Sequence, residues 1–122
     1  MSQFKVLVVD DEPFIARSLT FVLRKNSYEV LEARDGEEAL DVIARERPDL
    51  VFLDVMMPKL TGFEVAEKIR ENADYEAMRI VLLTAKGQDS DRERGESVAD
   101  EYITKPFSPT RILERTRDLL GD

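Results

Sequence analysis

The sequence contains no cysteine and no histidine. The lack of cysteine excludes disulfides, thiolate nucleophiles and cysteine-bound metals, and it fits a reducing compartment. The lack of histidine excludes, within this chain, a Ser-His-Asp triad, a histidine general base and a histidine-bound metal. Any chemistry must therefore use carboxylates, hydroxyls, lysine or a hard cation.

Membrane-spanning runs, a secretory leader and an excess of positive charge are absent as well. No apolar stretch approaches the roughly 20 residues of a membrane-spanning helix, and residues 1–5 lack the charged and apolar regions of a signal peptide. The net charge of −8 argues against a surface that binds nucleic acid. We therefore expect a cytoplasmic protein with no membrane contact and no direct nucleic-acid contact.

The composition is that of an ordinary folded domain. The 122 residues are 43% hydrophobic and 36% charged, which is typical of one globular domain covering residues 1–122. Short apolar runs alternate with longer segments of helical period, and five strand–helix units indicate an α/β fold with a parallel sheet and helices on both faces. We predict strands at 4–9, 28–32, 49–54, 79–84 and 101–104. We predict helices after Glu12, Asp35, Thr61 and Pro109, and a weaker, highly charged helix at 89–98.

Polar side chains follow the apolar runs where the predicted strands end. Asp10 and Asp11 end the first run, Asp54 ends the third, Thr84 ends the fourth, and Lys105 lies just beyond the fifth. The carboxyl ends of parallel strands meet at one edge, where such folds bind ligands, so we expect these five side chains at one rim. Three carboxylates placed together repel one another unless a cation neutralises them. Mg²⁺ is the cation we expect, because it takes carboxylate, water and phosphoryl oxygens.

Each of these residues also has a simpler structural interpretation. The two acids after the first strand precede Glu-Pro and could cap a helix. Thr84 fits ordinary strand propensity, and Lys105 fits a solvated surface. Asp54 favours a functional site, because the residues after it do not begin a helix. A cis Lys105–Pro106 bond would direct the lysine toward the rim.

The same residues give the chain a close resemblance to the receiver domains of response regulators in two-component signalling, over essentially its whole length. The resemblance implies a flavodoxin-like (βα)5 fold, a doubly wound five-stranded parallel sheet in the order 2-1-3-4-5. Four motifs in order make it highly specific. They are Val-Val-Asp-Asp-Glu at 8–12, Leu-Asp-Val-Met-Met-Pro at 53–58 with Gly62, Leu-Leu-Thr-Ala at 82–85, and Tyr-Ile-Thr-Lys-Pro-Phe at 102–107.

The resemblance implies that Asp54 is the phosphoacceptor. It would take a phosphoryl group from a phosphohistidine of a sensor histidine kinase or a histidine phosphotransfer protein. Asp11 would be the main carboxylate ligand of Mg²⁺, with Asp10 acting directly or through water, and Asp54 and the backbone carbonyl of Met56 would complete the protein ligands. A carboxylate can act as a covalent nucleophile in this way when cations offset the incoming charge.

The resemblance also implies a switch. Thr84 and Lys105 would contact the phosphoryl oxygens, Thr84 would move toward the phosphoryl group, and Tyr102 would turn inward. This two-state change would alter the face formed by the fourth helix, fifth strand and fifth helix, which a downstream effector protein or domain would contact. Met56 and Lys86 occupy positions that tune the lifetime of the phosphoryl group in this family. The implied protein is a signalling switch and not an enzyme with a separate substrate.

The region between the fourth and fifth strands departs from the family pattern. Lys105 follows Thr84 by 21 positions, one fewer than we expect, and Val98-Ala99 stands where Gly-Ala is usual. We infer a one-residue deletion near the end of the fourth helix, with loss of a glycine that eases the turn. The deletion would change the partner face and leave the rim intact.

Contact between two copies is a further expectation for this partner face. The run at 102–109 resembles that of winged-helix regulators, which often pair through the fourth and fifth helices. Asp100, Arg111 and Arg115 are candidate charges for a homodimer that forms on phosphorylation.

Other functions remain as alternatives. A constitutive, non-phosphorylated interaction module would keep the receiver fold without the chemistry. An aspartyl-phosphate phosphatase of the haloacid-dehalogenase type wants a second Asp two residues after the nucleophile, where this chain has Met56. A flavodoxin-like cofactor carrier wants a hydroxyl- and glycine-rich loop after the first strand, where this chain has residues 10–13, Asp-Asp-Glu-Pro.

Overall fold

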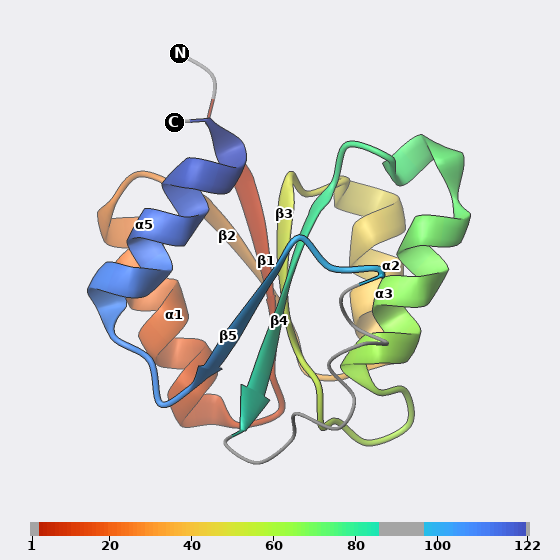
Figure 1. Ribbon diagram of the computed structural model, residues 1–122, viewed down its shortest axis with the longest axis horizontal. Coiled ribbons are helices and arrows are strands. Elements are labelled where there is room, and N and C mark those ends of the chain that lie inside the picture. The colour runs from red at the N-terminus through yellow and green to blue at the C-terminus, as the bar shows by residue number, and fades with distance from the viewer. Residues whose placement is uncertain (1–2, 86–96, 122) are drawn as a thin grey trace.

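The computed structural model of the chain describes residues 3–85 and 97–121. Five strands form one parallel sheet in the order β2-β1-β3-β4-β5, so the expected fold class and strand order are confirmed. Helices α1 and α5 cover one face of the sheet and α2 and α3 cover the other (Figure 1). The strands are β1 Lys5–Val9, β2 Glu29–Ala33, β3 Leu50–Asp54, β4 Arg79–Ala85 and β5 Glu101–Lys105. The described helices are α1 Pro13–Lys25, α2 Gly36–Glu46, α3 Gly62–Glu71, the 3₁₀ turn η1 Ala73–Tyr75, and α5 Pro109–Leu120.

The central strands are buried on both faces, as their nearly continuous apolar sequences predict. Successive side chains alternate between the two faces, because the side-chain period of a strand is two. On β1, for example, Leu7 and Val9 pack in the cluster under α2 and α3, whereas Val6 and Val8 pack under α1 and α5. All four side chains are fully buried, which fixes the position of the strand end that follows them.

Side-chain caps mark three helix starts, two of them, at Asp35 and Thr61, as predicted, and one, at Ser108, that the sequence did not predict. Asp35 caps α2 by accepting a hydrogen bond from Glu38 N at 2.9 Å. Thr61 and Glu64 form a reciprocal capping box at the start of α3. Ser108 caps α5 by accepting from Arg111 N at 3.1 Å. These caps set where α2, α3 and α5 begin.

The predicted boundaries differ only slightly from the observed ones. Strand β2 lies one residue later than predicted, and β4 and β5 each extend one residue further. The sequence did not predict η1, whose Asn72 side chain accepts from Asp74 N at 2.9 Å. The helix predicted at 89–98 lies largely outside the described residues, and so does Lys86. None of the helices in the described part has the length and apolar character needed to cross a bilayer.

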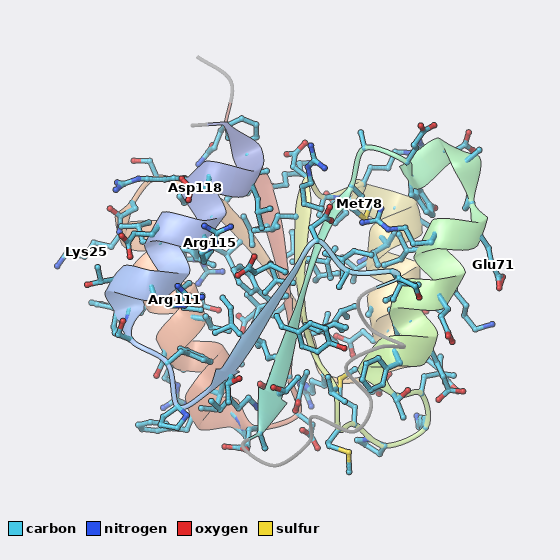
Figure 2. The ribbon with its side chains drawn as sticks, viewed as in Figure 1. Lys25, Glu71, Met78, Arg111, Arg115 and Asp118 are labelled. Atoms are coloured by element: carbon cyan, nitrogen blue, oxygen red, sulfur yellow. The ribbon has the colours of Figure 1, made fainter. Side chains whose placement is uncertain are left out.

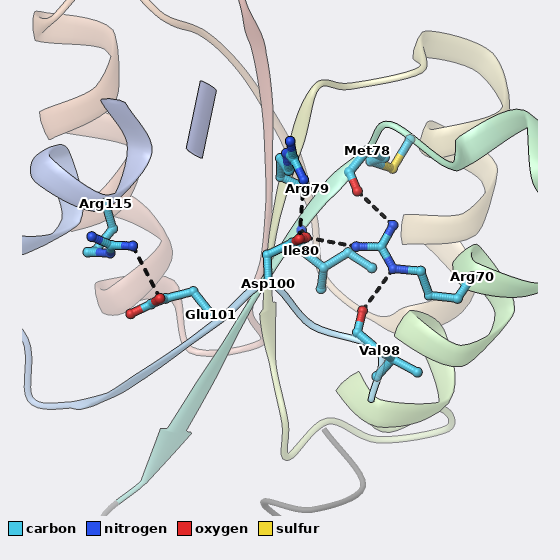
Figure 3. A network of polar contacts seen from close by, with 8 residues as sticks. All are labelled: Arg70, Met78, Arg79, Ile80, Val98, Asp100, Glu101 and Arg115. Atoms are coloured by element: carbon cyan, nitrogen blue, oxygen red, sulfur yellow. Dashed lines mark hydrogen bonds and ion pairs between the residues drawn. The ribbon is translucent and has the colours of Figure 1, made fainter. Parts of the chain in front are cut away.

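Arg70 of α3 ties three separate segments together at the amino end of β4 (Figure 3). Its guanidinium donates to the carbonyl oxygens of Val98 and Met78 at 2.9 and 2.8 Å. A third nitrogen lies 2.7 Å from Asp100 Oδ2, which also accepts from Ile80 N at 2.8 Å. The guanidinium therefore fixes the chain that leads into β5 against α3 and β4.

Replacing Arg70 with methionine should lower the free energy of unfolding by about 2 kcal/mol, because charged and carbonyl acceptors lose their donor. Urea unfolding would measure the change. Arg79→Met is the matched control, since Arg79 contacts Asp100 at 3.4 Å from an exposed position and should cost less than about 1 kcal/mol. Equal losses in the two variants would contradict a special role for Arg70.

Candidate functional site

The three rim carboxylates lie together at the carboxyl ends of β1 and β3. Asp10 and Asp11 follow β1 directly, and Asp54 is the last residue of β3. One carboxylate oxygen from each of the three lies within 4.8 Å of the others. Parallel pairing of β1 with β3, Val9 opposite Leu53, brings the two strand ends into register. The structure therefore assembles the acidic cluster that the strand pattern predicts.

Lys105 ends β5 and reaches across the rim into this cluster. Its Nζ lies 3.1 Å from Asp10 Oδ2 and 3.5 Å from Asp54 Oδ1, and its side chain is 15% exposed. The Lys105–Pro106 peptide bond is cis. Burial alone would lower the pKa of Lys105, but the carboxylates of Asp54 and Asp10 raise it above its usual value. Lys105 is thus a partly buried cation of the site and not a solvated surface lysine.

Asp10 and Asp54 are both buried, and each has one backbone N–H donor and a share of the Lys105 charge to stabilise its carboxylate. Asp10 Oδ1 accepts from Glu12 N at 2.9 Å, and Asp54 Oδ1 accepts from Met56 N at 3.2 Å. Burial and the nearby charge of Asp10 raise the pKa of Asp54 to about 7, although Lys105 and the Met56 amide oppose that rise. One lysine against three carboxylates leaves a negative excess. The hard oxygen donors and this excess fit a divalent cation such as Mg²⁺.

The capping interpretation of the first acids is correct only in part. Glu12 is the N-cap residue of α1, and it makes no side-chain capping hydrogen bond. Asp10 does accept from a backbone N–H at that helix start, while its second oxygen contacts Lys105. Asp11 is exposed at the rim. A residue needed only for capping would not require a partner 95 positions away.

The remaining predicted site residues lie around this cluster. Thr84 is buried near the end of β4, opposite Thr104 of β5. Tyr102 is partly buried in β5 and packs against the core cluster beneath α2 and α3. The Met56 side chain is 62% exposed, and the residue follows Asp54 in the β3–α3 loop. A role of the Met56 carbonyl as ligand, contact of Thr84 with a phosphoryl group and rotation of Tyr102 stay predictions.

The charges expected to join two copies make ion pairs within the chain. Asp100 pairs with Arg70 and Arg79. Arg111 and Arg115 pair with Glu101 at 3.6 and 3.3 Å, and Arg115 also pairs with Asp118 at 2.7 Å. Figure 2 shows Arg111, Arg115 and Asp118 along α5. A homodimer that used these charges would have to exchange pairs already formed, and it stays a prediction.

Comparison with known proteins agrees with this geometry. The model of the response regulator receiver domain family matches residues 6–117. The chain is 47% identical over 121 residues to the probable transcriptional regulator ycf27 of Porphyridium aerugineum, covering 98% of this chain and 49% of that protein. It is 45% identical over 117 residues to the alkaline phosphatase synthesis transcriptional regulatory protein PhoP of Bacillus subtilis, covering 95% and 48%. The chain thus spans about half the length of these relatives.

Solved structures show the same fold. A putative response regulator from Chloroflexus aurantiacus superposes with a TM-score of 0.93 at 34% identity, covering 99% of this chain and all of that one. The receiver domain of the sensor histidine kinase PA1611 of Pseudomonas aeruginosa, which has a magnesium ion coordinated in its active site cleft, gives 0.89 at 26% identity, covering 99% and 100%. With its strand order, its acidic rim and a family match over nearly its whole length, the chain belongs to the receiver domain family of response regulators.

Proposed function

We propose that this domain accepts a phosphoryl group on Asp54 from a phosphohistidine of a sensor histidine kinase or a histidine phosphotransfer protein. The observation that carries the proposal is the position of Asp54, a buried carboxylate with Asp10, Asp11 and Lys105 beside it. In the reaction a carboxylate oxygen of Asp54 bonds to phosphorus, the phosphorus–nitrogen bond of the donor breaks, and the donor nitrogen leaves with the electron pair. The product is an acyl phosphate on Asp54.

Lys105 supports this step through its charge. Its Nζ lies within 3.5 Å of Asp54, so it can offset the charge of a phosphoryl group attached there. Mg²⁺ would be held by Asp10, Asp11, Asp54 and the carbonyl of Met56, and when bound it would neutralise the phosphoryl oxygens. The magnesium in the related Pseudomonas receiver domain supports this assignment.

Intact-protein mass spectrometry after incubation with Mg²⁺ and acetyl phosphate tests the proposal. The wild-type chain should gain one phosphoryl group, about 80 Da. Asp54→Ala and a sample treated with EDTA should gain none. Absence of the adduct from the wild type, together with failure to bind beryllofluoride, would reject the proposal in favour of a constitutive interaction module.

Asp11 allows the metal site to be tested separately from the phosphoacceptor. It is exposed, so Asp11→Asn should change the free energy of unfolding by less than about 0.5 kcal/mol. Loss of a carboxylate next to a divalent cation should nevertheless weaken Mg²⁺ binding by at least about tenfold. Titration calorimetry of both proteins would measure this change. An unchanged affinity in Asp11→Asn would exclude Asp11 as the main ligand.

A groove next to the site offers a place for the donor protein to dock. It has a volume of about 270 Å³ and is lined by apolar residues of α1, among them Phe14 and Val22, and by Pro106 and Phe107 after β5. Phe14 is 76% exposed. Since these segments directly adjoin Asp11 and Lys105, a protein seated in the groove would lie close to Asp54. We propose that the phosphohistidine donor occupies it.

The output belongs to the same proposal. On phosphorylation Thr84 would move toward the phosphoryl group and Tyr102 would turn inward, which would change the partner face around β5 and α5. The relatives are transcriptional regulators about twice as long as this chain, and their names do not fit an output without nucleic acid. We therefore propose a downstream effector that contacts DNA through residues other than 1–122. We also propose that residues 1–122 act as one receiver domain, in the cytoplasm, as a signalling switch.

A further inference from the structure

A separate cleft of about 640 Å³ opens between α1 and the turn that joins β2 to α2. Its volume lies in the range of small-molecule sites. Three arginines line it, Arg17 and Arg24 from α1 and Arg34 from the β2–α2 turn. Asp10 and Asp11 also line it, so the cleft adjoins the acidic rim. No role proposed above uses these arginines.

The arginines are largely available for a ligand. Within residues 3–85 and 97–121, the side chains of Arg17 and Arg34 make no ion pair and no hydrogen bond. Arg24 donates one hydrogen bond, to the carbonyl oxygen of Val30 at 3.3 Å. Guanidinium groups present planar pairs of N–H donors that match the oxygens of phosphates and carboxylates. An anion in the cleft would therefore meet donors that the described protein does not use.

The charge of the cleft depends on the state of the rim. Four acids share it with the arginines: Asp10, Asp11, Glu32 and Glu38. Lys105 lies 3.1 Å from Asp10 and offsets its charge. The three arginines then balance the three remaining acids of the lining. A divalent cation at Asp10 and Asp11 would make the cleft positive. The cleft should therefore bind anions more tightly when the rim holds Mg²⁺.

A buried hydroxyl in the wall of the cleft also lacks a partner. Thr20 lines the cleft, is 6% exposed, and its Oγ1 has no hydrogen-bond partner in the described part of the chain. Buried hydroxyls are nearly always hydrogen-bonded, so an unpaired one calls for an explanation. Rotation about the Cα–Cβ bond would let this hydroxyl donate to an anion on the cleft floor.

We propose that this cleft binds a diphosphate group, with one phosphate held by Arg17 and Arg34 and the other directed toward Asp10 and Asp11. A diphosphate suits the site because its second phosphate can supply the phosphate oxygens that carboxylate-bound Mg²⁺ commonly takes. No bond is made or broken. The arginine contacts do not rest on the proposed phosphorylation of Asp54, whereas the tighter binding with Mg²⁺ rests on the metal site.

Titration calorimetry with inorganic pyrophosphate tests the proposal, with Mg²⁺ in excess over pyrophosphate and again in EDTA. The wild type should bind, and more tightly with Mg²⁺. The double variant Arg17→Ala/Arg34→Ala should bind at least about tenfold more weakly in both conditions. Arg111→Ala/Arg117→Ala is the matched control, because it removes the same charge from α5 outside the cleft, and it should bind as the wild type does.

Two results would overturn the proposal. One is no binding by the wild type at millimolar pyrophosphate. The other is equal binding by the arginine variant and its control, particularly if Asp11→Asn abolishes it, because the ligand would then contact only a rim metal. Phosphoryl transfer to Asp54 is read separately by mass, and the arginine variant should still gain its phosphoryl group. A titration with ADP separates free diphosphate from nucleoside diphosphate, and in either case the affinity must depend on Arg17 and Arg34.

Discussion

Asp54→Asn should make the metal-free domain more stable at pH 8, by about 2–4 kcal/mol in the free energy of unfolding. The pKa of Asp54 rises from 3.8 to about 7 in the folded protein, mainly through burial and then through the charge of Asp10. Folding therefore opposes ionisation of this group. An asparagine amide has no charge to bury, and its carbonyl oxygen can still accept from Met56 N as Asp54 Oδ1 does at 3.2 Å.

The pH dependence gives this prediction its sign. Below pH 3.8 both the folded and the unfolded state hold the proton on Asp54, so the carboxyl carries no penalty. The penalty grows as the pH rises from 3.8 to about 7, because the unfolded state ionises first, and it is complete above that range. The stability advantage of Asp54→Asn should therefore be largest at pH 8 and should shrink as the pH falls toward 4.

Urea unfolding in EDTA at pH 8 and pH 5 would measure both effects. Glu71→Gln serves as the control, because Glu71 is exposed at the end of α3 and the change removes the same formal charge (Figure 2). Saturating Mg²⁺ should reduce the difference between wild type and Asp54→Asn, since the cation neutralises the carboxylate. An asparagine variant no more stable than the wild type at pH 8 would refute the idea that the site holds its nucleophile at a cost to the fold.

The parts of this site that the sequence predicted are those set by strand ends. Parallel strands bring their carboxyl ends to one edge, so the placement of Asp10, Asp11 and Asp54 at one rim follows from the alternation of strands and helices. Their close approach also needs β1 to lie beside β3. Predicting that Lys105 reaches the acids needed two further conditions. Strand β5 must lie in the same sheet, and the lysine side chain must turn toward β1. The resemblance to receiver domains supplied the strand order, which the pattern of elements alone left open.

The parts that the sequence did not predict depend on side chains from distant elements. Nothing local marks Arg70 as different from other helix arginines, and its three contacts exist only because α3, β4 and the chain before β5 converge. The presence of Arg17 and Arg34 in the lining of one cleft likewise depends on how α1 packs against β2. The identity of Glu101 as the partner of Arg111 follows from the packing of α5 beside β5. Patterns of hydrophobicity do not carry such information.

Gly62→Ala should destabilise the domain by about 3 kcal/mol and also lower the yield of phosphorylated Asp54. A Cβ atom built on Gly62 would lie 3.0 Å from the Asp54 carbonyl carbon and from Val55 Cα, and closer still to the Asp54 carbonyl oxygen. These are backbone atoms, so no rotamer change can relieve the contact. Gly62 N also donates to Val55 O at 3.0 Å, which holds the two segments together.

Two opposing effects decide the sign of this change. Alanine is a better helix former than glycine by about 1 kcal/mol, and Gly62 is the first residue of α3, so an unobstructed substitution would stabilise the helix. The contact with the backbone of Asp54 and Val55 outweighs that gain. The start of α3 can move away only by breaking the Gly62–Val55 hydrogen bond and shifting the end of β3, which carries Asp54.

Gly121→Ala separates steric overlap from backbone preference. Gly121 has a φ of +71° at the end of α5, and an added Cβ there would meet no atom within 4 Å. Alanine at this position should cost about 1 kcal/mol through its left-handed backbone alone and should leave phosphorylation unchanged. For Gly62→Ala we therefore expect a lower free energy of unfolding in urea and a smaller phosphorylated fraction after acetyl phosphate treatment. For Gly121→Ala we expect only the free energy of unfolding to fall. Normal phosphorylation in a destabilised Gly62→Ala would show that the position of Asp54 does not depend on this close approach.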